Sequence, residues 1–146
     1  MTAISIRPAI HSDIAGIAAL ERAYYGDHGY PSALFYQALQ QWPQGLWVAS
    51  EQQLIGYLLV APSEPQQPHW LMSMLVAHAA RGRGVGHKLL QHFLATELNV
   101  NQLRLTVAAD NHAAQRLYQQ CGFEKIDDIA DFFGPGEHRW LYEWQR

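Results

Sequence analysis

The chain has 146 residues, of which 49% are hydrophobic and 16% are charged. An intrinsically disordered chain has few apolar residues and a high net charge, so this composition excludes one. The length is typical of one domain, and we expect residues 1–146 to form it. The formal net charge is −3, which argues against a protein that mainly coats nucleic acid, because that role needs a basic surface.

The cysteines, the histidines and the hydropathy of the chain exclude further kinds of site and protein. Cys121 is the one cysteine, so an internal disulfide and a cysteine-based zinc cluster are excluded. The eight histidines form no HExxH pair, and we expect no metal. The start of the chain lacks the apolar run of a signal peptide, and no stretch approaches the roughly 18 apolar residues of a membrane span. We therefore expect a cytoplasmic protein without a membrane or nucleic-acid partner.

The first part of the chain predicts a strand, two helices and a hairpin. Apolar residues recur at helical spacing after Ser12, which we expect to be the N-cap of the first helix. The polar segment 50–53 separates two strand-like runs, as in a hairpin. The predicted ranges are 4–7 for the first strand, 12–24 and 32–41 for the helices, and 46–49 and 54–60 for the hairpin strands.

The second part predicts alternating strands and helices. Residues 70–76 are nearly all apolar, which is typical of a central strand buried on both faces. The later ranges are 84–98 and 111–120 for helices, and 103–107, 123–126 and 140–144 for strands. The resulting order, β-α-α-β-β-β-α-β-α-β-β, predicts an α/β (α+β) fold. The strands at 70–76 and 103–107 should run parallel, joined by a right-handed crossover.

A glycine-rich turn between the strand at 70–76 and the following helix carries the clearest chemistry. Glycine lets a ligand approach the backbone closely, and the start of a helix favours an anion. Three of the chain's ten Lys and Arg residues lie on this turn: Arg81, Arg83 and Lys88. We expect a phosphate or pyrophosphate here. The turn is neither a Walker A loop nor a GxGxxG loop, and a plain turn with solvated arginines is the alternative.

A second motif follows the next strand. The two motifs are Arg81-x-x-Gly84-x-Gly86 and Asn111-x-x-Ala114-x-x-Leu117-Tyr118-x-x-x-Gly122-Phe123. In this order and spacing they closely resemble the GNAT superfamily of acetyl-CoA-dependent N-acetyltransferases. The resemblance is specific over residues 71–123. It implies a mixed central sheet of about six to seven strands flanked by about four helices, and acetyl transfer from acetyl-CoA to a primary amine by direct attack.

The resemblance also implies which residues form the site. The loop 81–86 would hold the CoA pyrophosphate on its N–H groups, and the end of the strand at 70–76 would pair with the pantetheine arm. Tyr118 would be catalytic, donating a proton to the departing sulfur. The implied cofactor-binding residues are Met74, Leu75, Val76, Arg81, Gly82, Arg83, Gly84, Val85, Gly86, Asn111 and Ala114. Alternatively, Asn111 is only a helix N-cap and Tyr118 an ordinary half-buried aromatic.

The general base stays open at this point. Many relatives carry a carboxylate on the strand before the loop, near the positions of Met72 and Ser73, and this strand has none. Ser73 could at most orient a water molecule. The remaining candidates are Glu21, Asp27, His28 and His69.

The acceptor amine would enter opposite CoA, between the first two helices and the last hairpin. Aromatic and acidic side chains in these segments predict a mouth for a cationic amine, unless most of the aromatics are core. The aromatics are Tyr24, Tyr25, Tyr30, Phe35, Tyr36, Phe132 and Phe133, and the acids are Asp127, Asp128, Asp131 and Glu137. The loop 132–137 resembles that of relatives that acetylate protein or peptide amines, and of some that acetylate arylalkylamines. The alternative function is a non-catalytic acyl-CoA sensor of the same fold that binds a partner protein, and a homodimer stays open.

Overall fold

Within residues 3–146, seven strands form one mixed sheet in the order β1-β2-β3-β4-β5-β7-β6. The computed structural model describes these residues; Met1 and Thr2, where the predicted domain begins, lie outside the described residues. The elements are β1 (Ser5–Pro8), α1 (Ile14–Tyr25), α2 (Ser32–Gln41), β2 (Leu46–Ser50), β3 (Leu54–Ala61), β4 (His69–Val76), α3 (Val85–Thr96), β5 (Gln102–Val107), α4 (His112–Gln120), β6 (Glu124–Ile129) and β7 (Arg139–Gln145). The predicted fold class and element order are confirmed.

Helix α1 starts differently from the prediction. Residues 11–13 form a short 3-10 turn before the helix, and Ser12 is not its N-cap. Instead, the Asp13 carboxylate accepts the Ile10 N–H at 2.8 Å and pairs with Arg7 of β1 at 2.7 Å. The hydrogen bond from Arg7 lowers the pKa of Asp13, so the carboxylate stays ionised and ties the start of α1 to the first strand.

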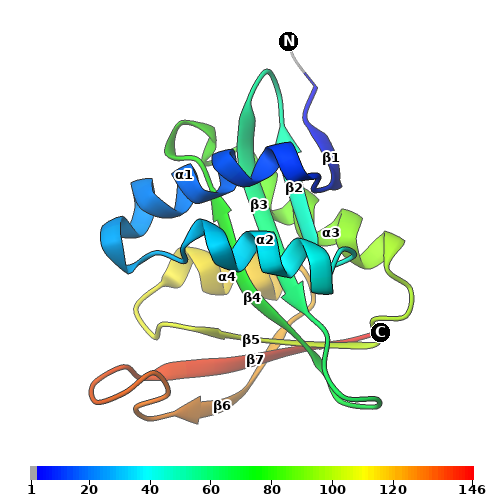
Figure 1. Ribbon diagram of the computed structural model, residues 1–146. Helices are drawn as coiled ribbons and strands as arrows, with labels where there is room; N and C mark the ends of the chain where they lie inside the picture. Colours follow the sequence, from blue (N-terminus) through cyan, green and yellow to red (C-terminus); the bar gives the residue numbers. More distant parts are fainter. Residues whose placement is uncertain (1–2) are drawn as a thin grey trace.

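The helices cover both faces of the sheet (Figure 1). Ile14 and Ile17 of α1, together with Phe35 of α2, are buried against strands β2 to β4 on one face. Leu89 and Phe93 of α3 are buried in a second apolar cluster on the other face. Both α1 and α3 present apolar side chains at helical spacing, which is why each buries one side.

Strands β4 and β5 are paired only where they begin. Their parallel register consists of His69 opposite Leu103 and Trp70 opposite Arg104. Just beyond this point β4 carries a bulge, because Ser73 and Leu71 pair with consecutive β3 residues and Met72 has no partner. A bulge bends a strand and increases its twist, so β4 turns away from β5 (Figure 1). The edge of β4 that faces β5 is therefore unpaired beyond Trp70.

This opening explains why the prediction for β4 was wrong on burial. The apolar run predicted a strand buried on both faces, but only Leu71 and Leu75 are fully buried within it. The remaining side chains are half-buried, because the opening between β4 and β5 runs along the strand.

Candidate active site

The opening between β4 and β5 is a pocket of about 710 Å³. Its walls are the end of α1, strand β4, the glycine loop with the start of α3, the end of β5, helix α4 and the start of β7. All but one of the residues predicted for the site line it: Met74, Leu75, Val76, Arg81, Gly82, Gly84, Val85, Gly86, Asn111, Ala114 and Tyr118. The fold thus brings together two motifs that are about 30 residues apart in the chain.

Arg83 is the exception, because its side chain does not line the pocket. Both of its terminal nitrogens donate to the Glu51 carboxylate in the β2–β3 turn, each at 2.7 Å. A bidentate pair of this kind braces the loop against the hairpin.

The glycine loop offers donors to an anion. Gly82 and Gly84 have φ angles of +78° and +73°, the left-handed region that other residues rarely adopt. No side chain caps the start of α3, so the first N–H groups of that helix have no partner from capping. The buried Nε2 of His87 also has no hydrogen-bond partner within residues 3–146. Unpaired donors around a positive helix end suit a phosphate.

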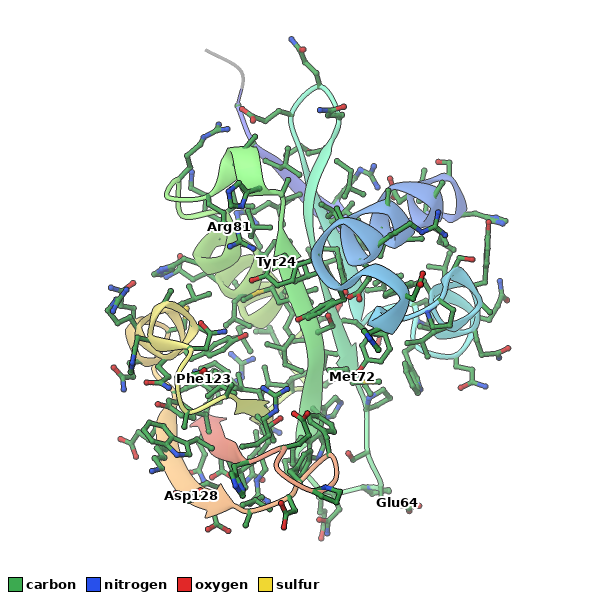
Figure 2. The ribbon with its side chains drawn as sticks, turned by 90° about the vertical axis from the view of Figure 1, so that its left-hand side faces the viewer. Tyr24, Glu64, Met72, Arg81, Phe123 and Asp128 are labelled. Atoms are coloured by element: carbon green, nitrogen blue, oxygen red, sulfur yellow. The ribbon has the colours of Figure 1, made fainter. Side chains whose placement is uncertain are left out.

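Arg81 and Tyr24 lie together at the loop end of the pocket (Figure 2). The Arg81 guanidinium lies 4.6 Å from the centre of the Tyr24 ring, a cation–π contact that holds it beside the loop. Asn111 caps helix α4, which was one of the two roles predicted for it, since its side chain accepts the Ala114 N–H at 3.2 Å. It also lines the pocket, so a CoA contact remains a prediction for it.

Tyr118 extends from α4 into the pocket, with its ring centre 5.7 Å from that of Phe123. Burial raises the pKa of its hydroxyl well above the ordinary value of a tyrosine, with smaller contributions from Tyr25 and Cys121. The hydroxyl is therefore protonated at neutral pH and available as a donor.

Glu21 is a buried carboxylate at the other side of the pocket, with 1% of its surface exposed. The hydroxyl of Tyr57 donates to Oε1, and the Tyr30 N–H donates to Oε2 at 3.0 Å. The Ser73 hydroxyl lies 3.2 Å from Oε1 and 2.6 Å from the Tyr57 oxygen. Burial and the hydrogen bond to Glu21 raise the pKa of Tyr57 far above its ordinary value, so Tyr57 remains a donor. These donors occupy lone pairs on both carboxyl oxygens of Glu21.

No salt bridge within residues 3–146 involves Glu21, so its charge has no partner in the described chain. A buried charge without a partner is costly, and a ligand carrying a positive charge would relieve that cost. Of the other candidate bases, His28 lines the pocket, whereas Asp27 and His69 do not. Of the four candidates that the sequence named, Glu21 and His28 line the pocket, and Glu21 is the buried one.

The aromatic residues predicted for the acceptor mouth line the pocket in part, but the predicted acidic residues do not. Tyr24, Tyr25, Tyr30 and Phe133 line the pocket, whereas Phe35 is core and Tyr36 packs on His11 outside. None of Asp127, Asp128, Asp131 and Glu137 lines it. Asp128 lies on the outer strand β6, away from Arg81 (Figure 2). Arg139 lines the pocket instead of these acids. The sequence did not indicate this residue as part of the site.

Among residues 3–146 no three His, Cys, Asp or Glu side chains gather as potential metal ligands. In the same part of the chain, no helix has the length and apolar character needed to cross a membrane.

The chain belongs to the Acetyltransferase (GNAT) family, whose model matches residues 14–123. This confirms the family expected from the two motifs.

Named relatives agree with this family assignment. The L-2,4-diaminobutyric acid acetyltransferase of Vibrio cholerae is 29% identical over 108 residues, which cover 65% of this chain and 62% of that protein. The chain therefore matches less than two thirds of that relative's length. The N-alpha-acetyltransferase of Saccharolobus solfataricus is 23% identical over 152 aligned positions, covering 94% of this chain and 90% of that protein. Arabidopsis thaliana Naa50, solved with the bisubstrate analogue CoA-Ac-MVNAL, has the same fold, with a TM-score of 0.81, 18% identity and coverage of 98% and 99%.

Proposed function

We propose that residues 1–146 are one domain that transfers an acetyl group from acetyl-CoA to a primary amine by direct attack. One observation carries the proposal: the hydroxyl of Tyr118, whose pKa burial raises, and the buried carboxyl group of Glu21 line the same pocket. They extend from α4 and α1, which flank β4 (Figure 2). Names of relatives support an amine acceptor, since one acts on L-2,4-diaminobutyric acid and another on an N-alpha amine.

The glycine loop and β4 would hold the donor, which supplies the reactive thioester. The CoA pyrophosphate would lie on the N–H groups of residues 82–87, beside Arg81. The pantetheine amides would pair with the unpaired edge of β4 at Met74, Leu75 and Val76, in the way that a peptide adds a strand to a sheet. Asn111 and Ala114 would contact the arm from the other side.

Transfer then requires that the amine nitrogen bonds to the acetyl carbon and that the carbon–sulfur bond breaks with its electron pair on the sulfur. The amine gives up one proton, and the departing thiolate takes one up. Glu21 would accept a hydrogen bond from the amine and fix its position, which is a large part of such catalysis. The α-amine at the start of a peptide has a pKa near 7.7–8.0, so a substantial fraction of it is neutral near pH 8 without a strong base. Tyr118 would donate a hydrogen bond to the sulfur as negative charge develops there.

The pH dependence of the wild-type rate tests the state of Tyr118. Because burial raises the pKa of Tyr118 above its ordinary value, the donor form persists through the alkaline range where a free tyrosine would begin to ionise. We expect kcat to show no alkaline decline up to about pH 10, the ordinary tyrosine pKa. Steady-state rates from pH 6 to 10 would check this. An alkaline limb below pH 10 that disappears in Tyr118→Phe would contradict it.

Charge at the glycine loop tests the phosphate assignment. Gly84→Asp places a carboxylate at a left-handed position beside the proposed pyrophosphate, whereas Gly84→Asn has almost the same shape without the charge. We expect the aspartate variant to bind acetyl-CoA at least about tenfold more weakly than the asparagine variant, because like charges repel. Calorimetric titration of both variants gives the comparison. Equal affinities of the two variants would show that the pyrophosphate does not bind at this loop.

A further inference from the structure

Arg139 is a cationic side chain in the pocket that the proposed reaction leaves unused. It lies at the start of β7, paired in register with Ile129 of β6, and it lines the pocket with Phe133. The guanidinium packs over the Phe133 ring, 4.9 Å from its centre. Since β7 is separated from β4 by β5, Arg139 approaches the pocket from a different element than the glycine loop does.

Arg139 acts electrostatically at the acceptor end. Its charge lowers the pKa of the Tyr25 hydroxyl, partly opposing the increase that burial and the Glu21 carboxylate cause. Tyr25 in turn contributes to the raised pKa of Tyr118. Arg139, Tyr25, Glu21 and Tyr118 all line the same pocket, in agreement with these effects.

The Arg139 guanidinium has no anionic partner in the described chain. None of the four ion pairs found within residues 3–146 includes it, and its Nε is shielded from solvent without a hydrogen-bond acceptor. A shielded N–H without an acceptor costs free energy, and an arginine fork fits a carboxylate through two parallel hydrogen bonds. The pocket thus presents one unpaired cation and one unpaired anion, Glu21.

We propose that the acceptor is an amine that also carries a carboxylate, as a small amino acid does. Arg139 binds the carboxylate, which directs the amine toward Glu21 and the thioester. This inference rests on the proposed acetyl transfer and adds the class of acceptor. A carboxylate can come from a free amino acid or from the side chain of an acidic first residue of a peptide, and the test separates these sources.

Matched acceptor pairs test the assignment. The first arm compares L-alanine and L-2,4-diaminobutyrate with their carboxamides, and the second compares peptides that begin with Asp and with Asn. A neighbouring carboxylate stabilises the protonated amine, so at a given pH less of that amine is neutral and able to attack. This effect alone would make the carboxamides the faster acceptors. In one of the two arms, we expect the wild type to have a kcat/KM at least about tenfold higher for the acceptor with the carboxylate than for its uncharged counterpart. One charge-assisted contact accounts for a difference of this size. The arm that shows this preference identifies the source.

The Arg139→Gln variant should lose the preference, and Arg139→Lys should retain part of it because the charge remains. Affinity for acetyl-CoA and the melting temperature should be unchanged in Arg139→Lys, which controls for folding. Equal rates within all three pairs, or a preference that survives in Arg139→Gln, would overturn the carboxylate contact while acetyl transfer stands. Intact acetyl-CoA binding without acetylation of any acceptor would refute the proposed function and this inference with it.

Discussion

Glu21→Gln is expected to lower kcat/KM for the amine acceptor by roughly a hundredfold, the scale on which a misplaced reactant loses rate. The substitution keeps the size of the side chain and removes its charge. Glutamine presents one oxygen where the carboxylate has two, so it cannot accept from Tyr57, Ser73 and the Tyr30 N–H as the carboxylate does. The amine would lose both its charged partner and its fixed position.

Binding and stability measurements separate this role from a structural one. Acetyl-CoA affinity should stay within a few-fold, because the glycine loop is unchanged. A loss of stability of about 1–3 kcal/mol is expected from the disrupted buried hydrogen bonds, and thermal unfolding would measure it. Tyr57→Phe serves as a comparison, since it removes one donor and leaves the carboxylate in place. If Glu21→Gln only lowers the melting temperature and leaves acceptor kinetics intact, then Glu21 is a structural residue.

Tyr118→Phe is expected to lower kcat by roughly ten- to a thousandfold, at or somewhat below the usual worth of a positioned proton donor. The phenylalanine ring can keep the packing against Phe123, so folding and acetyl-CoA affinity should be preserved. The raised pKa of Tyr118 keeps its hydroxyl protonated, and so available as a donor, while negative charge develops on the sulfur.

Tyr36→Phe provides a matched control, because Tyr36 packs on His11 and does not line the pocket. It loses the same oxygen from an exposed tyrosine, and its kinetics should equal those of the wild type. Steady-state rates with saturating acetyl-CoA would compare the two variants. If both have wild-type kcat, Tyr118 only packs, and water supplies the proton.

The order of elements and the donor half of the site could be predicted from sequence because their signals are local. The glycine loop occupies six consecutive residues, and the Asn111 to Phe123 motif lies on one helix and its end. Burial of β4 could not be predicted, since the apolar run does not reveal a bulge at Met72 or the loss of pairing with β5.

The acceptor half depends on contacts between distant parts of the chain. Glu21 meets Tyr57 and Ser73 across 36 and 52 residues, and these contacts follow from how α1 lies on the sheet. One local signal did exist: Glu21 follows Ile14 and Ile17 on the buried side of α1, and a carboxylate on an apolar helix face needs an explanation. Arg139 had no such signal. Several charged residues lie on the β6–β7 hairpin, and only the packing of the hairpin decides which of them lines the pocket.

The most direct measurement follows the acetyl group itself. The protein would be incubated with acetyl-CoA labelled in the acetyl group and with amino acids, peptides with free N-termini and aliphatic amines, while released thiol and acetylated amine are quantified together. We predict that labelled amide and free thiol form in equal amounts with at least one acceptor, and that Tyr118→Phe slows both equally. Acetyl-CoA that binds in the pocket but yields no acetylated amine with any acceptor would contradict this account and indicate an acyl-CoA-binding protein without transferase activity.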